Sequence, residues 1–209
     1  MLALVGICIK VSNFQAVSDS QILQKQLVEA FGTMFKQQAG NIYMAKTAKG
    51  AAKIVDEIVK ERSIGIVCCG PFLIDGKRFD SMLDNKLLPF EKLQSTRRRD
   101  GALGELGSLD VGITSPRAAI SQTGSLVEIC SSDNERLLSS LSRVHIAVLK
   151  SSAIVENLFD IAPMIRSALT ASKKPTITLI GGPSRTSDIE LKSVLGVHGP
   201  HEVDTVIIE

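Results

Sequence analysis

The segment from Asn41 to Cys69 constrains the fold most, because its pattern is strand, helix, strand. Asn41–Ala45 is a short apolar run, and Thr47–Arg62 carries apolar residues at helical spacing behind an N-cap residue, Thr47. Ile64–Cys69 is an almost unbroken apolar run, which is typical of a strand covered on both faces. This order predicts a βαβ unit with parallel pairing and a right-handed crossover. The chain is therefore expected to be an α/β protein.

The rest of the chain continues this alternation. Strands are expected at 1–10, 109–113, 126–130, 144–149, 176–180 and 203–208. Helices are expected at 17–37, from Pro116 toward Gly124, at 152–159 and at 160–171. We predict a largely parallel sheet flanked by helices. Residues 1–209 form a single domain in this interpretation, and 1–40 are a strand and a helix that can pack at its periphery.

Residues 70–109 give the weakest pattern. Asp84–Leu93 fits either a strand or a short helix, and the following stretch to Ser108 is rich in arginine and glycine. A long loop inside a domain is often a lid or a binding loop. The alternative is a disordered surface excursion.

Charge and cysteine usage exclude several classes of function. A net charge of +2 is too small to predict a nucleic-acid partner. The four cysteines form no C-x-x-C pair, so no zinc or iron–sulfur framework is present, and free cysteines suit a reducing cytoplasm. The N-terminal run MLALVGICIK has no basic segment before it and is too short to span a bilayer, so it is expected to be a strand or a poorly defined leader. We expect a cytoplasmic protein without a membrane span or a metal site.

Two polar bends are candidate anion sites. Ser187 and Glu190 have the spacing of a capping box, which predicts a helix beginning at Asp188, and its amides could hold an anion together with Arg185. The alternative is that Arg185 pairs with the acids of its own helix. Residues 123–125 form a Thr-Gly-Ser turn that could hold a phosphate or carboxylate, or could be only the end of a short helix.

Three sequence blocks resemble one family. GGPSRTSDIE at 181–190, followed by GVHGP at 196–200, closely resembles the C-terminal signature of the lactate-utilisation protein C family, also called the LUD-domain or YkgG-like family. Residues 112–114 with 119–126, and residues 145–148, resemble two further blocks of that family. The resemblance covers about residues 110–209, whereas the N-terminal half matches the family only in layout.

The resemblance implies a fold similar to ribose-5-phosphate isomerases, glucosamine-phosphate deaminases and CoA-transferases, which bind anionic ligands in loops at strand ends. It also implies a link to the oxidation of L-lactate to pyruvate beside iron–sulfur partner subunits. This chain would then be an accessory subunit that binds no cofactor itself, the clusters lying on the partners, and that binds a small carboxylate or phosphate. A homodimer is a further expectation. The alternatives are a stand-alone CoA-transferase-like or sugar-phosphate isomerase-like enzyme, and a ligand-sensing module without chemistry.

The same resemblance implies the members of a ligand site. The candidate residues are Thr123, Gly124, Ser125, His145, Ser184, Arg185, Asp188, Glu190 and His198. The two acids would orient Arg185 or accept a proton, and the two histidines titrate near neutrality and could transfer protons. For each histidine the alternative is a structural imidazole bonded to the backbone. No catalytic residue can be assigned.

Glu128 interrupts an apolar strand. It either faces solvent, which is the commoner arrangement, or is a buried acid with a raised pKa in a site.

Overall fold

Parallel strands form the central layer of the molecule. The computed structural model describes residues 9–62, 65–95, 109–171, 175–187, 193–195 and 199–209. The six-stranded sheet has the order β1-β14-β9-β6-β2-β5, and all of its pairings are parallel. Its strands are β1 (Asn41–Ala45), β14 (Glu202–Ile208), β9 (Val144–Lys150), β6 (Leu109–Thr114), β2 (Ile66–Cys69) and β5 (Leu87–Leu88). The predicted α/β fold with a largely parallel sheet is confirmed.

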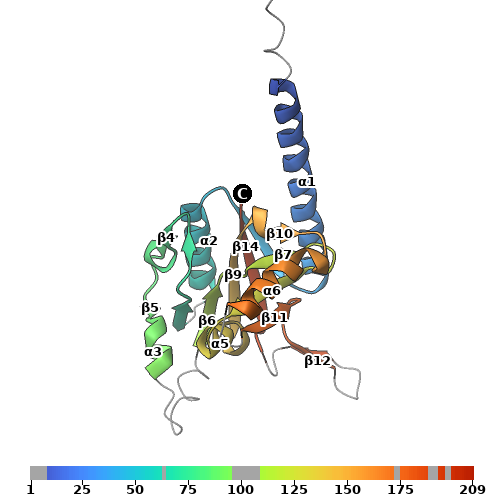
Figure 1. The fold of residues 1–209 in the computed structure, drawn as a ribbon. Coiled ribbons are helices and arrows are strands. Elements are labelled where there is room, and N and C mark those ends of the chain that lie inside the picture. The colour runs from blue at the N-terminus through green and yellow to red at the C-terminus, as the bar shows by residue number, and fades with distance from the viewer. Residues whose placement is uncertain (1–8, 63–64, 96–108, 172–174, 188–192, 196–198) are drawn as a thin grey trace, which may run out of the picture.

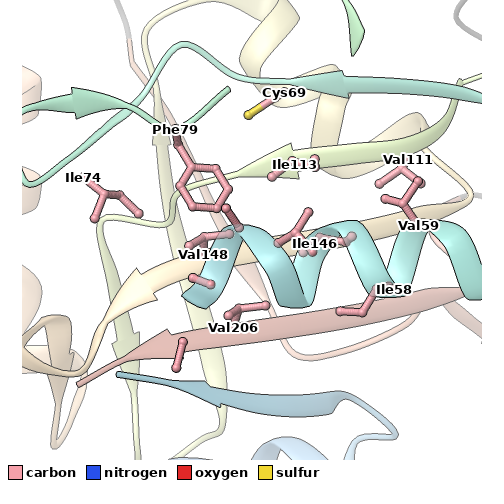
Figure 2. Packing of buried hydrophobic residues seen from close by; sticks show 14 of the residues in the cluster. Ile58, Val59, Cys69, Ile74, Phe79, Val111, Ile113, Ile146, Val148 and Val206 are labelled. Carbon is pink, nitrogen blue, oxygen red and sulfur yellow. The ribbon is translucent and has the colours of Figure 1, made fainter. Parts of the chain in front are cut away.

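Helix α2 (Ala48–Glu61) covers one face of this sheet (Figure 1). Its N-cap is Thr47, as predicted, and the Thr47 hydroxyl accepts a hydrogen bond from the Gly50 amide at 3.0 Å. Figure 2 shows the apolar side chains of α2 among those of the sheet strands. The labelled members of this core are Ile58, Val59, Cys69, Ile74, Phe79, Val111, Ile113, Ile146, Val148 and Val206.

The predicted pairing of the first two strands with each other is wrong. β1 pairs with β14, and three strands separate β1 from β2 in the sheet. Burial gives the reason: β14 is buried along almost its whole length and occupies the interior of the sheet, whereas β1 is half-exposed and forms its edge. Neighbours along the chain therefore share a sheet without pairing.

A second sheet lies against the opposite face. Its order is β10-β7-β8-β11, with β7, β8 and β11 antiparallel in turn. Its strands are β10 (Ile154–Val155), β7 (Ala118–Ile120), β8 (Ser125–Cys130) and β11 (Thr176–Ile180). Leu126 of β8 packs with Val203 and Ile207 of β14 and with Phe31 and Phe35 of α1 (Ile9–Gln37). The C-terminal part of α1 thus closes this core, while its N-terminal part extends away from the sheets (Figure 1).

Smaller elements complete the described fold. They are the strands β3 (Leu73–Ile74), β4 (Lys77–Arg78), β12 (Arg185–Ser187) and β13 (Ser193–Leu195), the helices α3 (Phe90–Ser95), α5 (Asp133–Leu141) and α6 (Ala162–Thr170), and the 3-10 turns at Asp80–Met82, Ser151–Ala153 and Leu158–Ile161. No helix in the described part of the chain is both long enough and apolar enough to cross a membrane.

Two predicted helices are wrong. The segment after Pro116 forms β7 and a turn, because its residues pair with β8 in an antiparallel hairpin that satisfies their backbone groups. The segment 152–159 forms short 3-10 turns and β10, which pairs with β7. The helix expected from 160 is α6, and it begins at Ala162 with Pro163 in its first turn.

Some expectations fall outside the described residues. The predicted N-terminal strand lies mostly in residues 1–8, although Ile9 and Lys10 already belong to α1. The arginine-rich loop lies mostly in 96–108, and the helix expected from Asp188 lies in 188–192. The described residues on either side of that helix, Arg185–Ser187 and Ser193–Leu195, pair as antiparallel strands.

Two glycine bends hold the C-terminal end of α1. The side-chain amide of Gln38 donates to the Thr123 carbonyl at 2.5 Å, and an added Cβ on Gly124, where φ is +62°, would lie 2.6 Å from the Phe35 backbone nitrogen. Gly182, with φ of +113°, meets the same helix end, since its added Cβ would lie 2.5 Å from the Gln38 carbonyl oxygen. Both positions need glycine for backbone conformation and for close approach.

Replacing Gly124 tests this contact. We expect Gly124→Ala to lower the free energy of unfolding by about 2–4 kcal/mol, because steric overlap with α1 adds to the cost of a left-handed backbone. Gly76→Ala is the matched control, since Gly76 has φ of +75° and nothing within 4 Å of an added Cβ. Gly76→Ala should lower the free energy of unfolding only by the cost of the left-handed backbone, about 1–2 kcal/mol. Urea unfolding measures both, and equal losses would contradict a packing role for Gly124.

Candidate functional site

A cavity of about 800 Å³ opens at the carboxyl ends of β2 and β6. Gly70 and Pro71, which follow β2, line it, as do Thr114 at the end of β6 and Ser115 after it. Its lining also includes Arg117, Glu128, Cys130, Ser131 and Glu135, with apolar walls from Phe72, Leu138, Met164 and Ala168. Sites in α/β proteins usually lie at this edge of the sheet, so the cavity is the candidate site.

Glu128 lies beside this cavity and is 3% exposed. It belongs to β8 and shares a strand face with Leu126, whose side chain packs toward the central sheet. Alternation along the strand therefore directs the carboxylate between the two sheets. The commoner expectation for this residue, a solvent-facing position, is wrong.

A hydrogen-bonded chain joins Glu128 to the central sheet. The Thr114 hydroxyl donates to Glu128 Oε1 at 2.5 Å and lies 2.8 Å from His145 Nε2. A hydroxyl has one hydrogen, so at His145 the Thr114 oxygen accepts, and Nε2 carries the proton. His145 is completely buried, and its Nε2 is 3.4 Å from Glu128 Oε1. Three residues from β6, β8 and β9 thus form one polar unit.

Two atoms of this unit have no partner. Among the residues that the structure describes, Glu128 Oε2 and His145 Nδ1 are buried without a hydrogen bond. Leaving a buried polar atom unsatisfied typically costs about 1–3 kcal/mol. Unsatisfied atoms of this kind are rare in folded proteins and are often found where a ligand or water binds. One of these two atoms, Glu128 Oε2, belongs to a residue that lines the cavity.

The surroundings of Glu128 favour its charged form. Burial raises the pKa of this carboxyl, but the hydrogen bond and charge of His145, with smaller contributions from Ser139 and Thr114, outweigh burial and lower the pKa below its usual value. The raised pKa expected for a buried acid here is therefore wrong, because a histidine lies beside it.

Besides Glu128, the ionisable side chains that line the cavity are one cation, one further acid and a thiol. Arg117 is exposed, and no carboxylate in the described part of the chain forms an ion pair with it. Glu135 already accepts the Ser131 amide at 2.8 Å. Burial raises the pKa of the Cys130 thiol to about 12, so it is not a thiolate nucleophile at neutral pH. No group of three or more metal-ligating side chains among the described residues is placed to hold a metal ion.

The sequence-predicted site residues lie mostly elsewhere. Residues 123–125 form the turn that meets α1. The Ser184 amide donates a hydrogen bond to the Pro200 carbonyl, and Arg185 is exposed on β12. His145 lies one hydroxyl away from a cavity-lining acid. Asp188, Glu190 and His198 are outside the described residues.

The two glycine bends converge on the last turn of α1 and on Gln38, the residue that follows it. Neither bend lines the cavity. Sequence reasoning missed Thr114 and Arg117 as candidate site residues. A threonine at the carboxyl end of a buried strand and a glutamate inside an apolar one are the signals that could have found this site.

Comparison with known proteins places the chain in a family. The model of the LUD domain matches residues 28–208. The chain therefore belongs to the LUD domain family. The resemblance found in the C-terminal half of the sequence is confirmed, and the match extends through most of the N-terminal half.

Similar proteins carry one recurring name. Lactate utilization protein C of Anoxybacillus flavithermus is 26% identical over 199 residues, which are 93% of this chain and 84% of that protein. Lactate utilization protein C of Shouchella clausii is 30% identical over 122 residues, 58% of this chain and 53% of that protein. The uncharacterized protein YkgG of Escherichia coli is 32% identical over 101 residues, 47% of this chain and 44% of that protein. The matched region is thus about half the length of two of these relatives.

A solved structure shares the fold. The crystal structure of a DUF162 family protein from Deinococcus radiodurans superposes with a TM-score of 0.63 at 15% identity, and the match covers 89% of this chain and 98% of that one. The closer likeness to ribose-5-phosphate isomerases, glucosamine-phosphate deaminases and CoA-transferases stays a prediction.

Removing the Thr114 hydroxyl tests the polar unit. We expect Thr114→Val to lower the free energy of unfolding by about 1–3 kcal/mol at neutral pH, because Glu128 loses a donor without a change of shape. Thr114→Ser, which keeps the hydroxyl, is the control. Urea unfolding measures the three proteins, and equal stability of the valine variant and the wild type would contradict the role of the hydroxyl.

The same variants should differ in pH dependence. The folded-state pKa of Glu128 lies below its ordinary value of 4.5, so its stabilisation is complete above that value and is lost as the pH falls through the folded pKa. Loss of the Thr114 hydrogen bond should raise the folded-state pKa of Glu128 in the valine variant, so the stability of that variant should begin to fall at a higher pH. An unchanged acid limb would contradict the assignment.

Proposed function

We propose that this chain acts in lactate utilisation, as an accessory subunit of an L-lactate-oxidising iron–sulfur complex, and that it binds a small carboxylate in the cavity at the ends of β2 and β6. Family membership over residues 28–208, with relatives named Lactate utilization protein C, carries this proposal. The cavity and its polar groups support the binding part.

The cysteines support a division of labour with partner subunits. Cys68 and Cys69 are buried consecutive residues of β2, and consecutive strand residues point to opposite faces, so they do not offer two ligands to one cluster. Cys130 is buried on β8. Electron transfer would therefore belong to partner subunits, and this chain would hold the organic acid or a surface of the partner.

The cavity residues suit a small organic acid. Arg117 presents a forked donor that matches a carboxylate, and it is exposed at the cavity. Glu128 lines the same cavity, and its Oε2 is buried. A ligand with one anionic group would pair with Arg117.

Affinity purification tests the complex. A tagged copy in its native host, purified without oxygen, should retain proteins that carry iron and acid-labile sulfide, and the purified assembly should reduce an artificial electron acceptor when L-lactate is added. A tagged, unrelated α/β protein from the same host is the control. Purification of the chain alone, with normal growth on lactate after deletion of its gene, would contradict the proposal.

A stand-alone enzyme is the second candidate. A buried carboxylate in a cavity, bonded to a hydroxyl and an imidazole, is an arrangement that can act as a general base or a nucleophile. Turnover of an acyl-CoA or a sugar phosphate by the purified chain, abolished in Glu128→Gln, would favour this alternative. A ligand that raises the melting temperature without turnover in any assay would instead indicate a sensing module.

Two arginine substitutions decide where the anion binds. If the cavity holds the carboxylate, Arg117→Lys should weaken binding of L-lactate about tenfold, because an ammonium cannot form the paired contact. Arg185→Lys should then bind like the wild type. The sequence-based site at residues 123–125 and 184–185 predicts the reverse. Isothermal titration calorimetry measures both variants, with the melting temperature as the check on folding.

A further inference from the structure

We infer that the outer surface of α6 is a contact surface for a second copy of this chain, with a twofold axis near Ala162. The α6 surface consists of residues from this helix and from the 3-10 turn before it: Leu158, Phe159, Ala162, Ile165, Arg166 and Leu169. The inference goes beyond the proposed function, because it concerns contacts between identical chains rather than a ligand or the iron–sulfur partners. The homodimer expected from the sequence had no assigned surface, and this inference gives it one.

Helix α6 packs lightly on the second sheet. Its Met164 and Ile165 contact a cluster that includes Val127 of β8. Val127 follows Leu126, which packs toward the central sheet, so α6 lies on the opposite face of the second sheet. No residue of α6 is buried. A helix this short depends on the packing of its apolar side chains, and a partner on the outer surface would add to that packing.

The α6 surface exposes large apolar side chains beside a groove. Phe159 is 86% exposed, Leu169 is 60% exposed and Leu158 is 50% exposed. The groove has a volume of about 430 Å³, and all six residues of the α6 surface line it. Single exposed apolar residues are ordinary, whereas several of them around one groove indicate a surface that binds another protein.

The shape of this surface is complementary to itself. In a twofold contact a patch meets an identical patch, so the patch must carry both a projecting group and a space for it. Phe159 is the projecting side chain, and the groove beside it is the space. Ala162 is the smallest residue of the surface and lies midway between Phe159 and Ile165 in the sequence. With the axis at Ala162 and the two helices antiparallel, Phe159 of each copy would meet Ile165 of the other.

The charges of the same region are complementary as well. Arg166 is the one charged residue among the described residues that line the groove, and no carboxylate in the described part of the chain forms an ion pair with it. Glu156 and Asp160 are exposed just before α6. The antiparallel arrangement brings Arg166 of one copy toward these acids of the other and keeps the two arginines apart. Opposite charges that meet in this way favour a second copy as the occupant.

The size of the surface predicts a weak dimer. The α6 surface is roughly 20 Å long and roughly 10 Å wide, as expected of one short helix. Such a contact lies at or below the lower end of stable protein interfaces, which bury about 1,200–2,000 Å² in total. We therefore expect a reversible dimer with a dissociation constant of about 10–100 µM.

Sedimentation velocity of the full chain is the first test, from about 1 to about 500 µM, a range that brackets the expected dissociation constant. The wild type should pass from monomer to dimer across this range. Phe159→Gln should raise the dissociation constant about tenfold or more, because a central aromatic side chain is lost from the contact. Met44→Gln is the matched control, since Met44 is 45% exposed on the edge strand β1, and it should dimerise like the wild type.

A cysteine at the axis tests the arrangement. In a twofold contact centred on Ala162, the two introduced thiols of Ala162→Cys face each other and should form a disulfide under mild oxidation. The substitution is made together with Cys8→Ser, because Cys68, Cys69 and Cys130 are buried. Met44→Cys with the same Cys8→Ser change is the control and should give no crosslinked dimer on a non-reducing gel.

Each outcome bears on the inference. A wild type that stays monomeric throughout the range would overturn it and would leave a different protein as the occupant of the α6 surface. Dimerisation of equal strength in Phe159→Gln would also overturn it, as would a dimer in which Ala162→Cys forms no crosslink. Because these measurements use the chain alone, without lactate or partner subunits, the proposed function is decided separately.

Discussion

The short polar chain between the two sheets is the constraint on which the site depends. A carboxylate buried between β-sheets is costly unless it is paired, and Glu128 meets this requirement through Thr114 and His145 on the central sheet. The hairpin of β7 and β8 must therefore lie in one register over β6 and β9. Gly112 contributes to this geometry, since an added Cβ would overlap the backbone of α5 at Leu138. Its bare backbone lets α5 approach β6 two residues before Thr114.

Much of the fold follows from local patterns. β1 and α2 lie almost where the sequence predicts them, because an apolar run and a capped amphipathic helix are local signals. The order of the sheet is not local: β14 is buried on both faces and lies beside β1, and nothing within residues 41–69 reveals that neighbour. The β7 hairpin was missed for a similar reason, since Pro116 gives a helix-start signal and only pairing with β8 overrides it.

The candidate site was harder to predict than the fold, because a glycine in a bend can allow the close approach either of a ligand or of another part of the backbone. Gly124 and Gly182 resemble ligand-holding bends in sequence, yet in the structure a helix end takes the place of a ligand at both. Close approach by backbone and close approach by an anion demand the same residue. Glu128 is the less ambiguous signal, since a charge inside an apolar strand requires a partner. Sequence alone does not show whether that partner is water or, as here, Thr114 and His145.

The unsatisfied atoms explain how stability and binding can be linked at this site. Each end of the polar unit has one unsatisfied buried atom, Glu128 Oε2 and His145 Nδ1. The first belongs to a cavity-lining residue but is itself buried, so a donor that reached it would stabilise the folded state by satisfying it. Replacing Glu128 with an apolar residue would remove the cost of the unsatisfied Oε2. It would also leave the Thr114 hydroxyl and the His145 ring without their hydrogen-bond partner. The unit is thus retained or lost as a whole, which is why substitutions that keep its shape are the informative ones.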